Sequence, residues 1–142
     1  MNFFRFEDLR IYAKAMDYIV WLYNEMGISA NEGNKIDRFI EIFLTASQNI
    51  ALQMAEGSSR NKTQFLYYLK LSKSAVRECV VYTEMAFRMG IMNEEQKAHS
   101  RTQLMELTKM VGSLIASLQR SMNGNAKSEK EEFSGVEFPE FE

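Results

Sequence analysis

The chain has 142 residues, 46 % of them hydrophobic, with a single proline and a net charge of −2. Its single cysteine, Cys79, excludes an intrachain disulfide, and with only one histidine, His99, the chain lacks the ligands of most zinc sites. No run of about 18 apolar residues occurs, and Glu7 and Asp8 interrupt the N-terminal segment where a signal peptide would stay apolar. We therefore expect a cytoplasmic protein with no membrane association.

Apolar residues recur at steps of three and four in four successive segments, which is typical of amphipathic helices. The first predicted helix covers residues 6–26, and a polar connector follows at 27–34. The second runs from about residue 36 to Gly57, and the third covers roughly residues 62–89. The fourth begins near Asn93, and its leucines and Val111 form a narrow seam through Leu118.

These segments predict an all-α protein, an antiparallel up-down-up-down four-helix bundle. The predicted bundle spans residues 1–122, which carry 15 basic and 13 acidic side chains. Residues 123–142 carry 2 basic and 6 acidic side chains together with Phe133, Phe138 and Phe141. This composition predicts a disordered acidic tail that could serve as a short docking segment.

The junction between the second and third helices carries a set of turn residues. Gly57 is predicted to take a left-handed conformation at the end of the second helix. Glu56 in the last turn opposes the helix dipole, so we expect Arg60 or the first amides of the next helix to compensate it. Asn61 is expected to cap the third helix. Glu56, Gly57 and Arg60 are thus interpreted as a structural turn, with a ligand or partner contact at Glu56 as the alternative.

Basic side chains without intervening acids follow this turn. Lys70, Lys73 and Arg77 fall within about 60° of one another on a helix, and Arg88 lies near the same line although Glu84 interrupts it. Such a stripe could follow a phosphate backbone, or it could be a solvated face or a subunit contact. The candidate nucleic-acid or partner surface comprises Arg60, Lys62, Lys70, Lys73, Arg77 and Arg88.

The third helix is apolar around more than half its circumference, which indicates that it buries more than one side. Together with Trp21, which lies off the main stripe of the first helix, this predicts self-association. The expected oligomer interface contains Trp21, Tyr67, Tyr68, Val81 and Tyr82.

No group of residues in the sequence suggests catalysis. Cys79 lies among valines and is interpreted as a small buried hydrophobe, and His99 as a surface residue. Glu41, Glu78 and Glu106 lack the Glu-x-x-His pairs typical of di-iron bundles. We therefore expect a non-enzymatic protein with no catalytic residues, no cofactor and no metal.

Several short motifs, in this order and spacing, resemble one known family. They are Phe6-Glu7-Asp8-Leu9, Ala55-Glu56-Gly57 with Arg60, then Phe65, Leu69, Ser74 and Glu78, and finally Arg88-Met89-Gly90. Over residues 4–120 the chain resembles the four-helix-bundle proteins encoded in intervening sequences of 23S rRNA genes, a group related to the accessory variability determinant subunits of diversity-generating retroelements. The resemblance implies a cytoplasmic, non-enzymatic homo-oligomer, with a pentamer favoured. The retroelement subunits bind nucleic acid and a reverse transcriptase and are strongly basic, so a sequence pI near 5.6 counts against a reverse-transcriptase partner here.

Two functions follow as expectations. The first is an oligomeric binding or assembly module that contacts nucleic acid, rRNA or DNA, through the basic surface of the third helix. The alternative is a purely structural or regulatory oligomer that acts through protein contacts, with the acidic aromatic tail as its docking segment.

Overall fold

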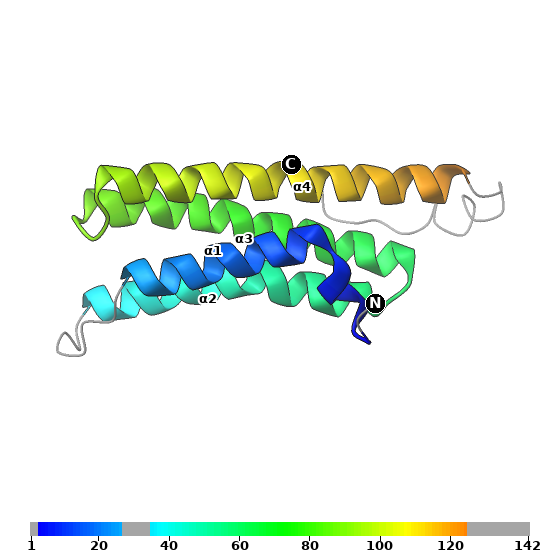
Figure 1. Ribbon diagram of the computed structural model, residues 1–142, viewed down its shortest axis with the longest axis horizontal. Helices are drawn as coiled ribbons and strands as arrows, with labels where there is room; N and C mark the ends of the chain where they lie inside the picture. Colours follow the sequence, from blue (N-terminus) through cyan, green and yellow to red (C-terminus); the bar gives the residue numbers. More distant parts are fainter. Residues whose placement is uncertain (1–2, 27–34, 125–142) are drawn as a thin grey trace.

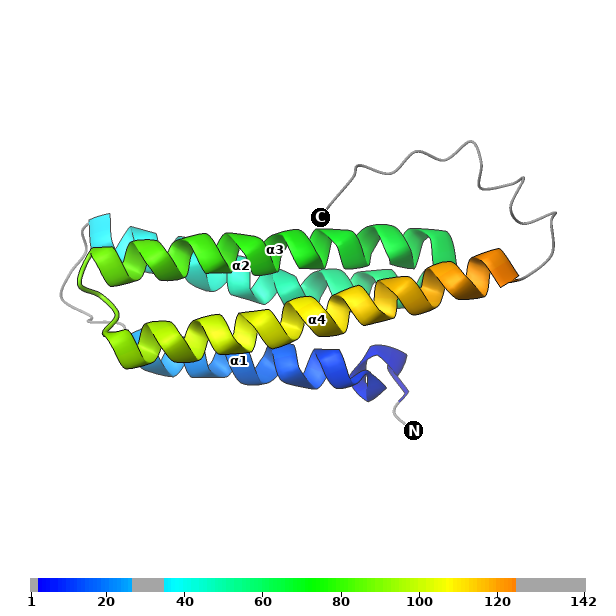
Figure 2. The ribbon, with the colours of Figure 1, turned by 90° about the horizontal axis from the view of Figure 1, so that it is seen from above.

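Four antiparallel helices form an elongated bundle in the computed structural model, which describes residues 3–26 and 35–124 (Figures 1 and 2). A short 3-10 turn, η1 (Arg5–Asp8), precedes α1 (Arg10–Met26), α2 (Lys35–Ser58), α3 (Lys62–Arg88) and α4 (Glu94–Gly124). Successive helices contact each other, and α1 also contacts α4, so the four helices close around one core. The predicted four-helix bundle is therefore confirmed.

The first helix begins later than the sequence predicts. η1 ends at Asp8, and Leu9 takes an extended conformation before α1 begins at Arg10. This break lets the chain turn, and the Phe6 ring lies 5.1 Å from that of Tyr12. The predicted start at residue 6 is thus wrong, because these aromatic residues pack across a turn rather than along one helix.

The core is apolar along the whole bundle and includes Tyr18, Phe43, Met54, Leu69 and Leu104, which are fully buried. Burial of such side chains stabilises the fold by about 1.5–3 kcal/mol each before the entropy of ordering is counted. The seam predicted for the fourth helix is confirmed at Leu104, Leu107 and Val111, which are buried.

Buried hydroxyl groups connect three of the helices. Ser100 of α4 lies 2.8 Å from the Tyr18 hydroxyl of α1 and 2.7 Å from Oγ1 of Thr83 on α3. The Thr83 hydroxyl also approaches the carbonyl of Cys79 at 2.7 Å. Burial raises the pKa of Tyr18 well above its ordinary value, and the network supplies the partners that a buried hydroxyl needs.

The helix ends follow the predicted capping chemistry. The amide of Gln64 donates to Oδ1 of Asn61 at 2.9 Å, which caps α3. Asn93 and Gln96 form a reciprocal capping box at the start of α4, with both bonds at 2.8 Å. After α3, Gly90 adopts a φ of 76°, a left-handed conformation that suits glycine.

Candidate nucleic-acid and partner surface

The basic residues of α3 lie on the side of the helix that faces outward beside α4. Arg77 is exposed and Lys73 is half-buried one turn before it. Within the described residues neither of these side chains forms an ion pair, so both cations can meet a ligand. Lys70, which is half-buried, lies on the same side.

Glu84 interrupts the basic stripe in the sequence, but in the structure two cations neutralise it. One carboxylate oxygen lies 3.2 Å from Lys97 of α4 and the other 3.2 Å from Arg88 of α3. The bonds from Lys97 and then from Arg88 lower the pKa of Glu84. Lys97 also lies 4.2 Å above the Phe87 ring. This cluster of two cations and one anion is therefore net positive.

Sequence reasoning missed the contribution of α4 to this surface. Arg101 lies one turn beyond Lys97 on the same side of α4 and is exposed. Both residues line a shallow depression of about 570 Å³ together with Met105 and one acidic residue, Glu94. Lys97 and Arg101 lie 20 and 24 positions after Arg77 in the sequence, so no local pattern could have joined them to the stripe. We define the α3–α4 basic face as Lys70, Lys73, Arg77, Arg88, Lys97 and Arg101.

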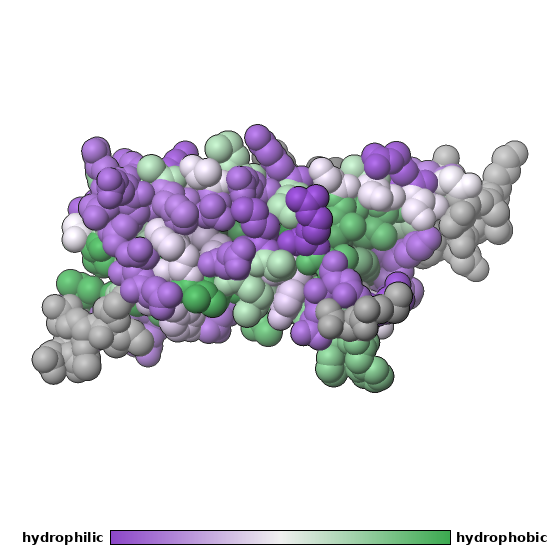
Figure 3. Space-filling model, viewed as in Figure 1, coloured by the Kyte–Doolittle hydropathy of each residue, from purple (hydrophilic) through white to green (hydrophobic). Residues whose placement is uncertain are grey.

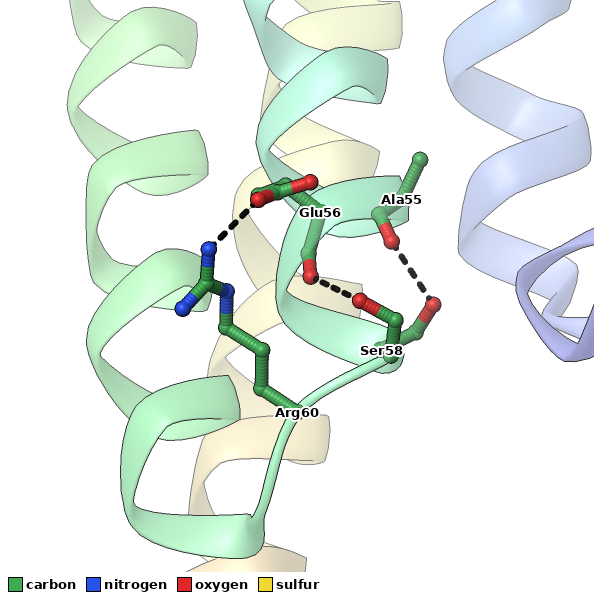
Figure 4. Close-up of polar contacts among 5 residues, drawn as sticks. Ala55, Glu56, Ser58 and Arg60 are labelled. Carbon is green, nitrogen blue, oxygen red and sulfur yellow. Dashed lines mark hydrogen bonds and ion pairs between the residues drawn. The ribbon is translucent and has the colours of Figure 1, made fainter.

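Arg60 and Lys62 do not join this face, because Arg60 lies in the turn before α3 and Lys62 is the first residue of α3. Nη2 of Arg60 lies 2.6 Å from Oε1 of Glu56, as Figure 4 shows. Its guanidinium also lies 5.0 Å from the centre of the Tyr68 ring. Lys62 donates to Oγ of Ser121 at 2.7 Å. The predicted pairing of Glu56 with Arg60 is confirmed, and both basic residues take part in contacts within the chain.

The predicted conformation of Gly57 is wrong. Among the described glycines only Gly90 has a positive φ, and Gly57 lies inside α2, one residue before its end. An added Cβ at this position would lie 2.5 Å from Cβ of Tyr68 and 3.0 Å from Cδ1 of Phe65. Glycine is needed because α2 and α3 approach closely at the turn.

Two residues predicted for a subunit interface pack within the chain. The Trp21 ring lies 4.5 Å from the His99 ring of α4 and 5.9 Å from that of Tyr18. Tyr82 of α3 lies 6.0 Å from Phe39 of α2. Both side chains are half-buried by these contacts.

The other predicted interface residues remain partly or largely accessible. Tyr67 and Tyr68 are half-buried, with their rings 5.7 Å apart, and Val81 is 57 % exposed. Contact of these residues with a second copy stays a prediction.

Exposed apolar residues instead gather along α1 and α2. Phe3 is 91 % exposed, and Leu52 of α2 is 59 % exposed. Leu52 and Met16 line an apolar groove of about 360 Å³ between α1 and α2. The exposed large apolar residues before and along α1 and α2 are Phe3, Phe4, Met16, Val20, Tyr23, Ile36, Ile42 and Leu52, of which Ile42 lines the groove toward α3.

The residues weighed for chemistry do not all meet at one site. Cys79 is buried, and this burial raises the pKa of its thiol far above the usual range. Glu41 and Glu78 line a groove of about 540 Å³ between α2 and α3, whereas Glu106 pairs with Lys14 of α1 at 2.6 Å. Among the residues that the structure describes, no cluster of three His, Cys, Asp or Glu side chains could hold a metal.

None of the described helices combines the length and apolarity that a membrane crossing requires.

The fold and its surfaces define a small all-α bundle with a basic face on α3 and α4 and exposed apolar residues along α1 and α2. Residues 7–113 match the family described as 23S rRNA-intervening sequence protein, and the chain belongs to this family. No curated protein and no solved structure matches the chain. A relation to the retroelement subunits stays a prediction.

Proposed function

We propose that this protein is a non-enzymatic, oligomeric binding module that engages a nucleic-acid backbone through the α3–α4 basic face. Membership of the 23S rRNA-intervening sequence protein family supports a small helical protein without an enzymatic role. The observation that carries the binding proposal is the joining of Lys73 and Arg77 of α3 with Arg101 of α4 on one side of the bundle. Several cations on one face can contact successive phosphates of a backbone.

The chemistry of the face favours backbone contact over base reading. Arginine and lysine neutralise phosphates and release counterions, which gives affinity without sequence information. Met105 of α4 is 54 % exposed beside Arg101, and Val81 of α3 is also exposed, so sugars or bases would meet apolar atoms next to the cations. The modest net charge predicts weak binding that is sensitive to salt.

Self-association completes the proposal, with a pentamer as the favoured assembly. The exposed apolar side chains of α1 and α2 supply the surface, because such a set on one side of a small domain marks an interaction site. A ring of copies would repeat the α3–α4 basic face and multiply weak contacts with one long nucleic acid. Sedimentation at micromolar concentration tests this, and a monomer there would refute it.

Salt-dependent binding to RNA and DNA tests the nucleic-acid proposal. Three engaged phosphates give a slope near −2.7 in a plot of log affinity against log salt, from about −0.9 per contact on duplex DNA. Charge reversal of Lys73 and Arg77 to glutamate should remove about two phosphate contacts and make that slope correspondingly shallower. The matched control reverses Lys35 and Arg38 on α2, which lie outside this face, and should leave the slope unchanged.

Absence of binding at 50 mM salt, or equal losses in both double variants, would refute the nucleic-acid proposal. A protein-interaction oligomer is the second candidate, favoured by the exposed apolar residues of α1 and α2. Deletion of residues 125–142 separates the two candidates. A nucleic-acid binder should bind more tightly without the acidic tail, whereas a protein that docks through its tail should lose its partner.

A further inference from the structure

The fourth helix extends further than the helix that covers it. α4 has 31 residues and α1 has 17, which correspond to about 46 Å and 26 Å at 1.5 Å per residue. The first turn of α1, at Arg10 and Ile11, borders one groove together with residues 109–114 of α4. Figure 2 shows the end of α4 continuing past η1 and the start of α1. The last ten residues of α4 therefore lack α1 as a neighbour.

An apolar groove lies where this cover ends. Its volume is about 470 Å³, and its apolar lining comes from Leu9, Ile11, Met110 and Leu114. Leu9, Met110 and Leu114 are only half-buried. Figure 3 shows an apolar hollow between the second half of α4 and the start of α1. These side chains would lose further contact with water if a segment occupied the groove.

The rim of this α1–α4 groove is basic on both sides. Arg10 of α1 and Lys109 of α4 are exposed and line it, with Asp8 as the acidic member of the lining. Neither cation forms an ion pair within the described part of the chain. The groove thus joins an apolar floor to two available cations, which suits a segment with alternating aromatic and acidic residues.

Residues 125–142 of the same chain have this composition. They carry 6 acidic and 2 basic side chains. Each of Phe133, Phe138 and Phe141 has a glutamate as a neighbour in the sequence, within the run Glu132–Glu142. The segment follows Gly124 directly, and Leu114 lies ten residues back along α4, about 15 Å away at 1.5 Å per residue. Nine residues lead from Gly124 to Phe133 and span up to about 30 Å, so the aromatic residues can reach the groove.

The other grooves match this segment less well. The groove of α1 and α2 that holds Met16 and Leu52 is apolar but has no charged residue in its lining. The depression that holds Lys97 and Arg101 offers cations, yet Met105 is its only large apolar residue. The groove of α2 and α3 contains two carboxylates against one cation, Arg38, so on balance it would repel an acidic segment.

We propose that residues 133–141 dock in the α1–α4 groove of their own chain, with phenylalanines on the apolar floor and glutamates at Arg10 and Lys109. Direct attachment to α4 gives the segment a local concentration of about millimolar, which makes weak contacts sufficient. The docked segment covers part of the apolar surface that α1 leaves open. This proposal does not depend on nucleic-acid binding, because the groove lies apart from the α3–α4 basic face.

Disulfide trapping in the full chain tests the docking. Ser113 is exposed in the groove, and Ser134 follows the first tail phenylalanine, so the double variant Ser113→Cys with Ser134→Cys places one thiol on each side. The native Cys79 is buried and will not compete. With oxidised glutathione as the oxidant, we expect rapid formation of a cross-linked single chain. The matched control is Gln119→Cys with Ser134→Cys, because Gln119 is exposed on α4 outside the groove lining and lies closer to the start of the tail than Ser113, and it should react about tenfold or more slowly.

Two other outcomes of the trapping experiment would overturn the proposal. Equal rates at the two positions mean that the segment does not prefer the groove. A cross-linked dimer as the main product means that a second copy supplies the segment, and a dilution series separates this from the single-chain reaction.

Further substitutions in the Ser113→Cys, Ser134→Cys double variant test which side chains hold the segment in the groove. Phe138→Ser with Phe141→Ser should slow the single-chain reaction about tenfold, and these residues lie outside the described bundle. Lys109→Glu should also slow it, whereas Arg101→Glu, an equal charge change on another side of α4, should not. Unchanged rates in the phenylalanine variant, or equal effects of the two charge reversals, would overturn the proposal.

Discussion

The close approach of α2 and α3 at Gly57 makes a sharp prediction for Gly57→Ala. The added Cβ would lie 2.5 Å from Cβ of Tyr68, whereas carbon atoms prefer separations of about 3.5–4.0 Å. Cβ of Tyr68 is fixed to the backbone of α3, so no rotamer change relieves the contact and the helices must move apart. Overpacking costs about 1–3 kcal/mol, and a contact this short between two backbone-fixed atoms falls in the upper part of that range, at about 2–3 kcal/mol. The higher helix propensity of alanine returns about 1 kcal/mol. We expect a net loss of about 1–2 kcal/mol in the free energy of unfolding.

Gly112→Ala is the matched control because Gly112 also lies inside a helix, but no atom of another helix lies within 4 Å of its Cβ position. Only the propensity gain applies there, so this variant should be more stable by about 0.5–1 kcal/mol. Urea unfolding followed by circular dichroism, at one fixed protein concentration, measures both changes. A Gly57→Ala protein that is as stable as the parent would refute the close-approach argument, and so would equal changes in the two variants.

Two further predictions concern the buried hydroxyl groups and the loss of stability at low pH. Ser100→Ala removes a hydrogen-bond partner of the buried Tyr18 hydroxyl and should lower the free energy of unfolding in urea by about 1–3 kcal/mol. The same change at an exposed serine, Ser117→Ala, should lower it by less than about 0.5 kcal/mol. Equal losses in the two variants would contradict the network. The ion pair with Lys14 lowers the pKa of Glu106 from its ordinary 4.5, so its contribution to stability is present above pH 4.5 and is lost as the pH falls through the folded-state pKa. Lys14→Gln should therefore flatten the decline of the urea midpoint below pH 4.5, and parallel declines in the two proteins would contradict this assignment.

The sequence by itself determined the class of fold and most helix boundaries. Apolar residues three and four positions apart form one stripe on each helix, and burying four such stripes together requires a bundle. Local chemistry was equally informative at the caps, because a cap joins residues only three positions apart. Asn61 was predicted to cap the third helix and does so, and the fourth helix was predicted to begin near Asn93, which caps it in the structure.

Only the tertiary structure decided how these local features meet. Arg101 joins the basic stripe because α4 packs antiparallel to α3, and Glu84 loses its repulsive effect because Lys97 arrives from another helix. Gly57 shows the same limit: a glycine near a predicted helix end indicates a left-handed residue or a close contact, and only the position of Tyr68 distinguishes them. Helical periodicity specifies which face of each helix is buried, but it does not specify the order and offset in which those faces pack against one another.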